Sequence, residues 1–254
     1  MRIALQLFTV RESAAERLAW TLNRVRDIGF EHVQWSGMPD LSCEEIRGFL
    51  DKAFLRAVAG HCSVDSFEHD YNGALRHWKH IGVEHLAPGG MMEECRESHA
   101  TWLQGAARLD ALGARLSADG ITLSYHNHDF ELGRYDIEAR SKLEWLYRYT
   151  APAHLKAEFD VAWLAVAGAD PAKWLSDYSG RCPIIHVKDV LLRERGASGP
   201  VFTALGDGNL DWDSIIEAAC NAGVEWLVYE QDTTRGDIWE DARRSVKFLK
   251  QYLL

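Results

Sequence analysis

Short apolar segments alternate with longer amphipathic segments along almost the entire chain. The apolar runs are four to seven residues long and are separated by polar or turn-forming residues, which is typical of buried β-strands. The pattern predicts eight strands, at residues 3–7, 32–35, 56–62, 84–88, 121–126, 154–160, 184–189 and 226–230.

The segments between these runs have the period of amphipathic helices. One of them opens with Ser42 and carries Glu45 in the position of a capping box. Several end at a glycine just before the next strand, as in "DIGF", "HIGVEHL", "ADGITL" and "NAGVEWL", which is a common helix C-terminus. We expect helices at residues 14–28, from 42 onward, and at 67–81, 98–118, 141–149, 171–178, 213–222 and 237–254.

Eight strand–helix units in 254 residues predict a single (β/α)8 TIM barrel domain spanning residues 1–254. The competing fold is an open doubly wound sheet, which normally places a glycine-rich phosphate loop after its first strand. Here the first strand runs into "QLFTVRE", which contains no glycine, so the barrel is favoured.

The charge and the apolar content of the chain indicate which kinds of binding partner are expected. The formal net charge is −10 and no six-residue basic run occurs, which argues against a nucleic-acid partner. No apolar run reaches the roughly 18 to 20 residues of a membrane span, and the polar start is unlike a signal peptide. We therefore expect a small-molecule ligand, no membrane contact, and a chain that acts alone or as a homo-oligomer.

Cysteine usage bears on location and on metal chemistry. The five cysteines are scattered and form no CxxC pair, so neither a disulfide framework nor a structural zinc knuckle is indicated. A reducing, cytoplasmic location is the expectation that follows.

Candidate chemistry gathers at the predicted strand ends, which form the active-site face of a barrel of this kind. These end residues are Trp35, His61, Pro88, His126, Asp160, His186 and Glu230. Because side chains alternate along a strand, residues two positions apart share a face. Glu158 should therefore lie with Asp160, and Lys188 with His186. His128 joins His126 if that strand continues through "LSYHNHDFE".

Carboxylates and imidazoles that converge from separate strands favour a single divalent metal ion. This set of ligands suits Mn²⁺, Zn²⁺, Co²⁺ or Mg²⁺, and the sequence does not choose among them. A lone histidine or aspartate at a strand end more often caps the strand by hydrogen bonding. The metal hypothesis therefore depends on several such residues meeting.

Four segments, taken in order, resemble the xylose-isomerase-like superfamily of sugar isomerases and epimerases. They are "EFDVAW", "IIHVKD", "LGDGNLDWDSII" and "WLVYEQD", and the similarity extends from "LQLFTVRE" to the final helix. The resemblance implies a divalent metal held by Glu, Asp, His and Glu from four strands. Asp160, His186 and Glu230 match the last three ligands, and the first falls at His126, where the family usually has Glu.

The departure at His126 leaves the division of roles open. His126 could be the fourth ligand. Alternatively, His128 or Glu131 folds back onto the metal and His126 acts as an acid–base group. The family's epimerases use two metal-bound glutamates as opposed acid and base, and this chain offers only Glu230 in that role.

The remaining candidates each have a structural alternative. Lys188 could stabilise an oxyanion, or pair with a barrel carboxylate such as Glu158. His61 could contact substrate or cap its strand, and Trp35 and Trp163 could present apolar faces to a sugar ring. The "GDGN" segment at 206–209 is expected to shape a turn rather than to hold phosphate.

We therefore expect a metal-dependent isomerase or epimerase of carbohydrate metabolism. It would act on a sugar or sugar-like keto-polyol through an ene-diolate, with manganese among the candidate ions. The candidate catalytic residues are Glu230, Lys188, His128 and Glu131, and Glu158 is a candidate substrate-binding residue. Two alternatives stay open: a lyase or dehydratase acting on a keto-inositol or a 3-keto-glycoside, and a non-catalytic sugar-binding barrel.

Overall fold

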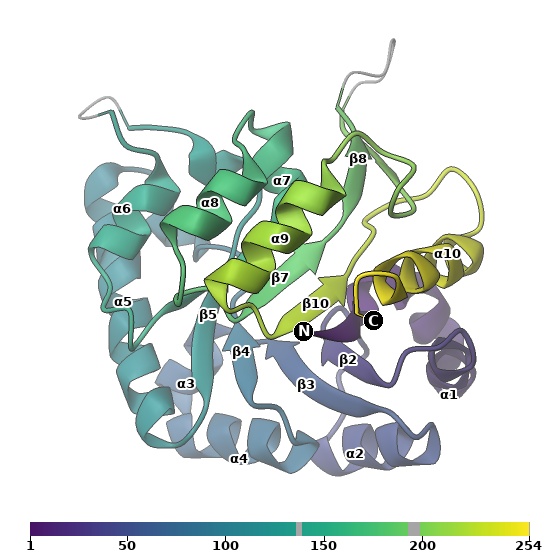
Figure 1. Ribbon diagram of the computed structural model, residues 1–254. Helices are drawn as coiled ribbons and strands as arrows, with labels where there is room; N and C mark the ends of the chain where they lie inside the picture. Colours follow the sequence, from purple (N-terminus) through teal and green to yellow (C-terminus); the bar gives the residue numbers. More distant parts are fainter. Residues whose placement is uncertain (136–138, 193–198, 254) are drawn as a thin grey trace.

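Eight parallel strands form a closed barrel in the computed structural model, which describes residues 1–135, 139–192 and 199–253 (Figure 1). This confirms the predicted (β/α)8 fold. Around the barrel the strands run in the order β1-β10-β7-β6-β5-β4-β3-β2. Their bounds are Arg2–Gln6 (β1), His32–Trp35 (β2), Arg56–His61 (β3), His85–Ala87 (β4), Thr122–His126 (β5), Lys156–Asp160 (β6), Ile184–Val187 (β7) and Trp226–Tyr229 (β10).

Helices surround this barrel on the outside (Figure 1). The larger ones are Arg11–Asp27 (α1), Cys43–Lys52 (α2), Tyr71–Ile81 (α4), His99–Ala118 (α5), Lys142–Arg148 (α6), Pro171–Asp177 (α8), Trp212–Ala222 (α9) and Ile238–Lys250 (α10). Shorter elements are Val64–His69 (α3), Val161–Val166 (α7) and the 3-10 helices Leu7–Val10, Glu93–Cys95 and Phe130–Leu132.

Local signals in the sequence account for several helix boundaries. The Ser42 side chain and Glu45 form the predicted capping box at the start of α2. Gly82 and Gly223 follow α4 and α9 with positive φ angles of 95° and 79°, a conformation that glycine adopts without steric cost. The expected helix at 67–81 is instead two helices. Asp70 separates them because its carboxylate caps the N–H of Gly73 and starts a new helix.

The barrel interior changes from apolar to polar along the strand direction. Its lower layer consists of Ala4, Ala59, Ile184, Trp226 and Val228, which are packed together and buried. The next inward positions on the same strands include Gln6, His61, His186 and Glu230. The larger apolar cluster lies between the strands and the helices. The alternation of side chains therefore brings a group of polar side chains to the inside of the barrel at its C-terminal end.

The expected strand at 184–189 ends early, because Asp189 begins a second, smaller sheet. β8 (Asp189–Leu191) pairs with β9 (Val201–Thr203) in an antiparallel hairpin outside the barrel. The buried carboxylate of Asp189 organises the loop that follows. It accepts hydrogen bonds of 2.8 to 3.4 Å from the N–H groups of Val190, Gly206, Gly208 and Leu210 and from Nε1 of Trp212.

These bonds explain the "GDGN" segment at 206–209. A β-carbon on Gly208 would collide with the Asp189 carboxylate, so only glycine permits this approach. The N–H groups of Gly206 and Gly208 are used by Asp189, and in this arrangement they do not offer a phosphate cradle.

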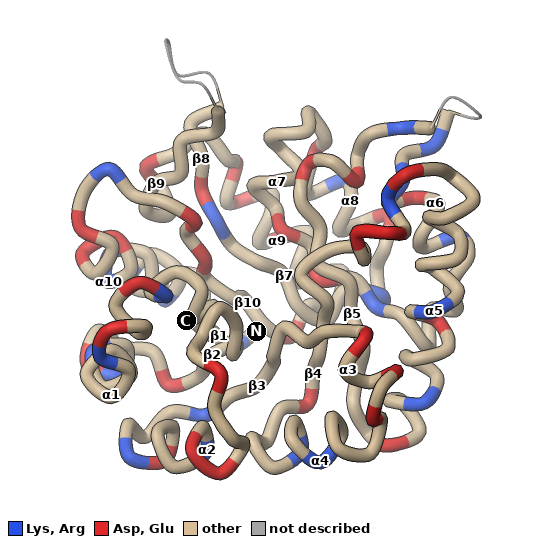
Figure 2. Tube along the Cα trace, turned by 180° about the vertical axis from the view of Figure 1, so that it is seen from behind, with Lys and Arg blue, Asp and Glu red and all other residues tan. Residues whose placement is uncertain are grey.

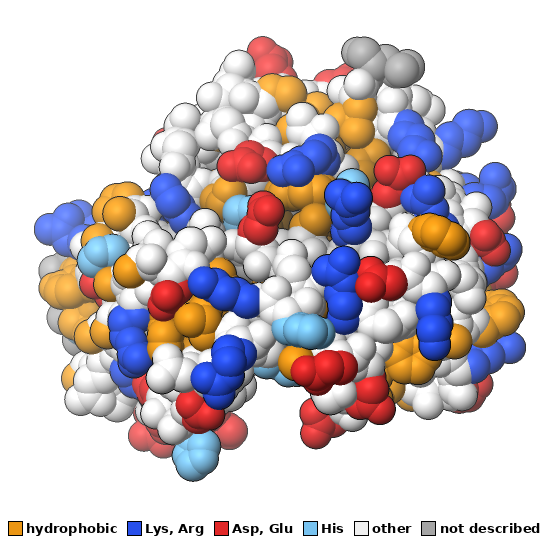
Figure 3. Space-filling model, turned by 90° about the horizontal axis from the view of Figure 1, so that it is seen from below, with side chains coloured by type: hydrophobic (Ala, Val, Ile, Leu, Met, Phe, Trp, Pro, Cys, Tyr) orange, Lys and Arg blue, Asp and Glu red, His pale blue; other side chains and the backbone are white. Residues whose placement is uncertain are grey.

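Acidic and basic residues are interspersed over the outside of the molecule (Figure 2). The face seen from below likewise mixes both signs of charge (Figure 3). Among the helices of the described residues, none has the length and apolar character required to cross a bilayer.

Candidate active site

Seven polar side chains meet inside the C-terminal end of the barrel, contributed by strands β2, β3, β5, β6 and β7 and by the segment that follows β10. Apart from the partly exposed His61, they are buried. They are Gln34, His61, His126, Glu158, Asp160, His186 and Glu230, and Lys188 joins them just after β7.

Glu158 is the centre of one half of this cluster. Its Oε1 accepts a hydrogen bond from Gln34 Nε2 at 2.9 Å, and it lies 2.9 Å from His61 Nε2 and 3.0 Å from His186 Nε2. Burial by itself raises the pKa of Glu158, but the two imidazoles outweigh it and hold this pKa well below its ordinary value. Glu158 is therefore an anion whose Oε1 is already fully engaged.

His186 connects the two halves. Its Nδ1 lies 2.8 Å from Glu230 Oε2, and its Nε2 lies 2.7 Å from Gln34 Oε1. Burial disfavours the charged imidazolium, yet the Glu158 and Glu230 carboxylates raise the pKa of His186 to about 10. Between these two carboxylates the ring is an imidazolium at neutral pH.

Lys188 is the centre of the other half. Its Nζ lies 2.8 Å from Asp160 Oδ2, 3.2 Å from Glu230 Oε2 and 2.8 Å from Asp232 Oδ2. Burial lowers the pKa of the ammonium, but the three carboxylates raise it above its usual value. Lys188 is thus a buried cation shared by three anions. The predicted structural alternative paired it with Glu158, and it pairs instead with these three.

Asp160 and Glu230 differ in how they are held. Asp160 caps helix α7, because its Oδ1 accepts the N–H groups of Ala162 and Trp163 at 3.0 Å each. Burial raises its pKa despite the neighbouring Lys188. Burial also acts on Glu230, but Lys188 and His186 prevail and lower its pKa. Each carboxylate keeps an oxygen directed at Lys188.

This arrangement includes two overlapping groups that could hold a metal ion. One consists of His61, His126, Glu158 and His186, the other of His126, Asp160, His186 and Glu230, each with one ligand atom per residue within 4.8 Å of the others. Nδ1 of His126 is buried without a hydrogen-bond partner. Burial and the neighbouring histidines lower the pKa of His126, so it is a neutral imidazole able to ligate.

His128 and Glu131, the alternatives for the fourth ligand, lie differently. The His128 ring is 5.0 Å from the His126 ring and 5.6 Å from the Trp163 ring, at the edge of the cluster. Glu131 faces away, since its oxygens accept Tyr125 OH at 2.8 Å and the His128 N–H at 2.9 Å. The idea that Glu131 folds onto a metal does not match this arrangement. These two hydrogen bonds make it part of the loop.

The prediction that Trp35 presents its ring to a sugar was wrong, because its side chain points away from the barrel interior. Trp35 is packed in the apolar cluster between strands and helices, whereas its neighbour Gln34 reaches Glu158 and His186. Trp163 does lie beside the cluster, with its ring 5.7 Å from Lys188 Nζ.

Two members of the cluster were missed by the sequence analysis. Gln34 is a polar residue flanked by the apolar Val33 and Trp35 in a buried strand, and this pattern indicates that its side chain points into the barrel. Asp232 lies two residues after Glu230, and the same alternation would have placed it beside Glu230.

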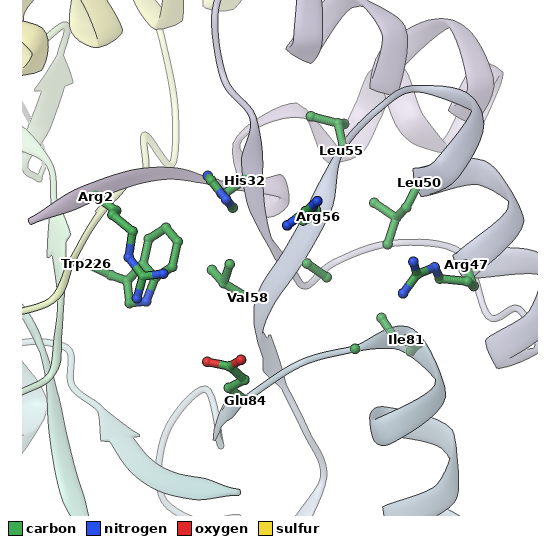
Figure 4. A pocket seen from close by; sticks show the side chains of 12 residues that line it. Arg2, His32, Arg47, Leu50, Leu55, Arg56, Val58, Ile81, Glu84 and Trp226 are labelled. Carbon is green, nitrogen blue, oxygen red and sulfur yellow. The ribbon is translucent and has the colours of Figure 1, made fainter.

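A separate cavity lies at the opposite end of the barrel (Figure 4). It has a volume of about 290 Å³. Its lining includes the first residues of four strands, namely Arg2, His32, Arg56 and Trp226. None of the catalytic candidates lines it.

Comparison with known proteins gives concordant matches. The family described as "Xylose isomerase-like TIM barrel" matches residues 22–252. Inosose dehydratase of Lacticaseibacillus casei is 28% identical over an alignment of 163 residues, which covers 58% of this chain and 53% of that protein. Inosose dehydratase of Salmonella agona is 26% identical over an alignment of 220 residues, which covers 78% of this chain and 70% of that protein. The chain thus spans about half the length of the first of these relatives.

Among solved structures, a sugar phosphate isomerase/epimerase from Parabacteroides distasonis superposes with a TM-score of 0.82 at 19% identity. The superposition covers 98% of this chain and 93% of that protein. At this identity the likeness concerns the fold.

Proposed function

The chain belongs to the xylose isomerase-like TIM barrel family, and on that premise we propose that it is a metal-dependent enzyme that removes a proton next to the carbonyl of a keto-polyol. Of the outcomes that the resulting enolate allows, we favour loss of water. The observation that carries the proposal is the buried cluster of His126, Asp160, His186 and Glu230, whose ligand atoms come within 4.8 Å of one another.

The residues fit a divalent ion, and we place it in this group rather than in the group around Glu158. Asp160 Oδ2 faces only Lys188, and Asp160, His186 and Glu230 are the positions that match the family's ligands. Glu158 Oε1 already has three partners, although its Oε2 has none, and His126, whose Nδ1 lacks a hydrogen-bond partner, belongs to both groups. To ligate the ion, the His186 imidazolium would release a proton to solvent and exchange one of its hydrogen bonds for the ion. A bound divalent ion supplies Lewis-acid stabilisation of the enolate oxygen.

Glu230 and Lys188 supply the proton transfers in this proposal. Glu230 is a carboxylate at neutral pH and accepts the α-proton, while the electron pair of the C–H bond moves into the enolate. The enolate then expels the β-hydroxyl, which leaves as water with a proton from Lys188. Glu230 Oε2 lies 3.2 Å from Lys188 Nζ, so the proton can return from one to the other and close the cycle.

Two features favour dehydration over epimerisation. The position at which the family usually has a second glutamate is His126, a buried neutral imidazole, so the carboxylate that would pair with Glu230 is replaced there. The curated relatives reported above are named inosose dehydratases.

Isomerisation is the second candidate, and His128 is the observation that supports it. Its ring lies at the edge of the cluster, and its Nδ1 is buried without a hydrogen-bond partner. An imidazole there can return a proton to a neighbouring carbon and convert the same enolate into an isomer.

One experiment distinguishes these outcomes. The protein is incubated in D₂O with each of Mn²⁺, Zn²⁺, Co²⁺ and Mg²⁺ and with a panel of keto-inositols, 3-keto-glycosides and keto-sugars. Dehydration gives an unsaturated product that absorbs in the ultraviolet, whereas isomerisation gives a deuterated isomer without that absorbance. Binding of the ketones with neither product would contradict the proposal and indicate a sugar-binding barrel.

A further inference from the structure

A second group of potential metal ligands lies outside the barrel, between helices α2 and α4. Cys43 is the first residue of α2, Glu44 follows it, and His80 lies in the last turn of α4. One ligand atom from each comes within 4.8 Å of the other two. In Figure 1 both helices lie along the lower edge of the molecule, and the same face seen from below carries several histidines at the surface (Figure 3).

The ligand atoms of the three side chains converge on one point. The Cys43 thiol donates a hydrogen bond to Glu44 Oε2 at 3.3 Å, so two adjacent residues direct their ligand atoms to one point. Cys43 is partly buried, while Glu44 and His80 are exposed and have rotamer freedom to move closer together. All three line an open hollow between the two helices.

The two helix ends favour negative charge at Cys43 and positive charge at His80, whereas burial and the Glu44 carboxylate raise the pKa of the Cys43 thiol. Cys43 and Glu44 are in the first turn of α2, where the helix dipole stabilises negative charge. His80 is in the last turn of α4, where the dipole favours positive charge. The capping box of Ser42 and Glu45 fixes the backbone that carries Cys43. Arg76 and Lys79 line the same hollow and oppose a cation, but both are exposed and can turn into solvent.

We propose that Cys43, Glu44 and His80 bind Zn²⁺ or a similar borderline divalent ion at a site separate from the active site. Sulfur, carboxylate and imidazole together are a ligand set typical of zinc, with solvent in the fourth position of a tetrahedron. On binding, the Cys43 thiol releases its proton to solvent and ligates as the thiolate, so affinity falls as the pH is lowered. His77, one turn before His80, also lines the hollow and offers a further imidazole there.

The test uses Co²⁺ as a spectroscopic probe on the full chain. A thiolate bound to Co²⁺ gives a charge-transfer band in the near ultraviolet, and the barrel cluster contains no cysteine. We expect this band in the wild-type protein, its absence in Cys43→Ser, and its loss on addition of Zn²⁺. Cys220→Ser is the matched control, because Cys220 is the other cysteine with solvent exposure and lies on α9. That variant should keep the band.

A second variant tests the ligand from the other helix. His80→Gln should weaken Co²⁺ binding by about 10- to 100-fold or more, because even changes outside the ligand set can have effects of this size. His69→Gln, on α3, is its control and should bind normally. The proposal is overturned if the saturated wild type shows no thiolate band, if Cys43→Ser keeps it, or if His80→Gln binds Co²⁺ as the wild type does. Since the band reports on sulfur alone, these outcomes are independent of any activity at the barrel site.

Discussion

Lys188 and Asp189 are adjacent in the chain, yet they belong to two buried charge centres that are built in opposite ways. Asp189 is surrounded by neutral donors, four backbone N–H groups and the Trp212 indole. Lys188 is surrounded by full charges, the carboxylates of Asp160, Glu230 and Asp232. The strand alternation sends one side chain into the barrel and its neighbour outward.

The difference separates a structural charge from a functional one. Every partner of Asp189 is fixed by the loop that it organises, so no bonding capacity remains for a ligand. The partners of Lys188 share one cation among three anions, and another cation or a polar substrate can replace part of that set. Buried like charges are costly unless they are compensated. A cluster that retains them is therefore a better candidate for chemistry than a carboxylate fully satisfied by dipoles.

The largest effect on stability should come from the structural centre. Asp189→Ala removes the acceptor of five hydrogen bonds and leaves buried donors without a partner, so the free energy of unfolding should fall by about 4 kcal/mol. Chemical denaturation measures this loss. The exposed Asp27→Ala is the control and should change stability little. A loss as small as that of the control would mean that the loop does not depend on Asp189.

Lys188→Met should destabilise by about 3 kcal/mol in the presence of a chelator, because it leaves buried carboxylates without their cation. Unlike the loss in Asp189→Ala, this loss should be partly restored by Mn²⁺, which can compensate the same carboxylates. Turnover should remain low after stability is restored. The exposed Lys247→Met serves as the control in both measurements. Equal destabilisation with and without metal would remove the distinction between the two centres.

Glu230→Gln keeps the shape of the side chain but removes its charge. Metal affinity should fall by at least the 10- to 100-fold typical of changes around a metal site, and solvent-deuterium exchange into substrate should fall with it. Calorimetric titration and mass spectrometry measure the two effects, with the exposed Glu217→Gln as the control. Normal metal binding and normal exchange in Glu230→Gln would exclude Glu230 from the proposed mechanism.

The smallest expected effect concerns Glu131, another buried carboxylate. Burial raises its pKa from the model-compound value of 4.5 to about 7 in spite of its two hydrogen bonds. Between these values the folded state holds the proton more tightly than the unfolded state, so this group makes stability fall as the pH rises from about 4.5 to 7. Denaturation at several pH values should show that Glu131→Gln reduces this slope, by at most one proton. An unchanged slope would contradict the raised pKa.

The fold could be predicted because each element carries its own periodic signal. Eight apolar runs separated by helical segments favour a barrel, and alternation within strands then places Asp160, His186 and Glu230 at one end. Places where a cap or a turn interrupts an expected helix or strand were harder to predict. The cap at Asp70 divides one expected helix, and the turn of the chain at Asp189 starts a hairpin whose pairing depends on residues after 200.

The sequence predicted most of the residues of the candidate site, but not which of them contact one another. Trp35 was predicted as a site residue because it is the last residue of β2, but the side chain that points into the barrel is that of Gln34. The partners of Lys188 come from the β6 and β10 ends of the barrel, so no spacing along the chain could identify them. Only the closed geometry determines which carboxylate lies within 3 Å of the ammonium.

The pairing of β1 with β10 has a consequence for how the chain becomes folded. Arg2 to Leu5 bond to Trp226 to Tyr229, so the first strand and the last strand of the barrel form one seam. A chain synthesised from its N-terminus exposes one edge of β1 until residue 229 has been made. Until then β7 also lacks its neighbour on that side. Two open strand edges are sites for pairing with another molecule. The interval before the last strand emerges is therefore the period in which a nascent chain is most vulnerable to aggregation.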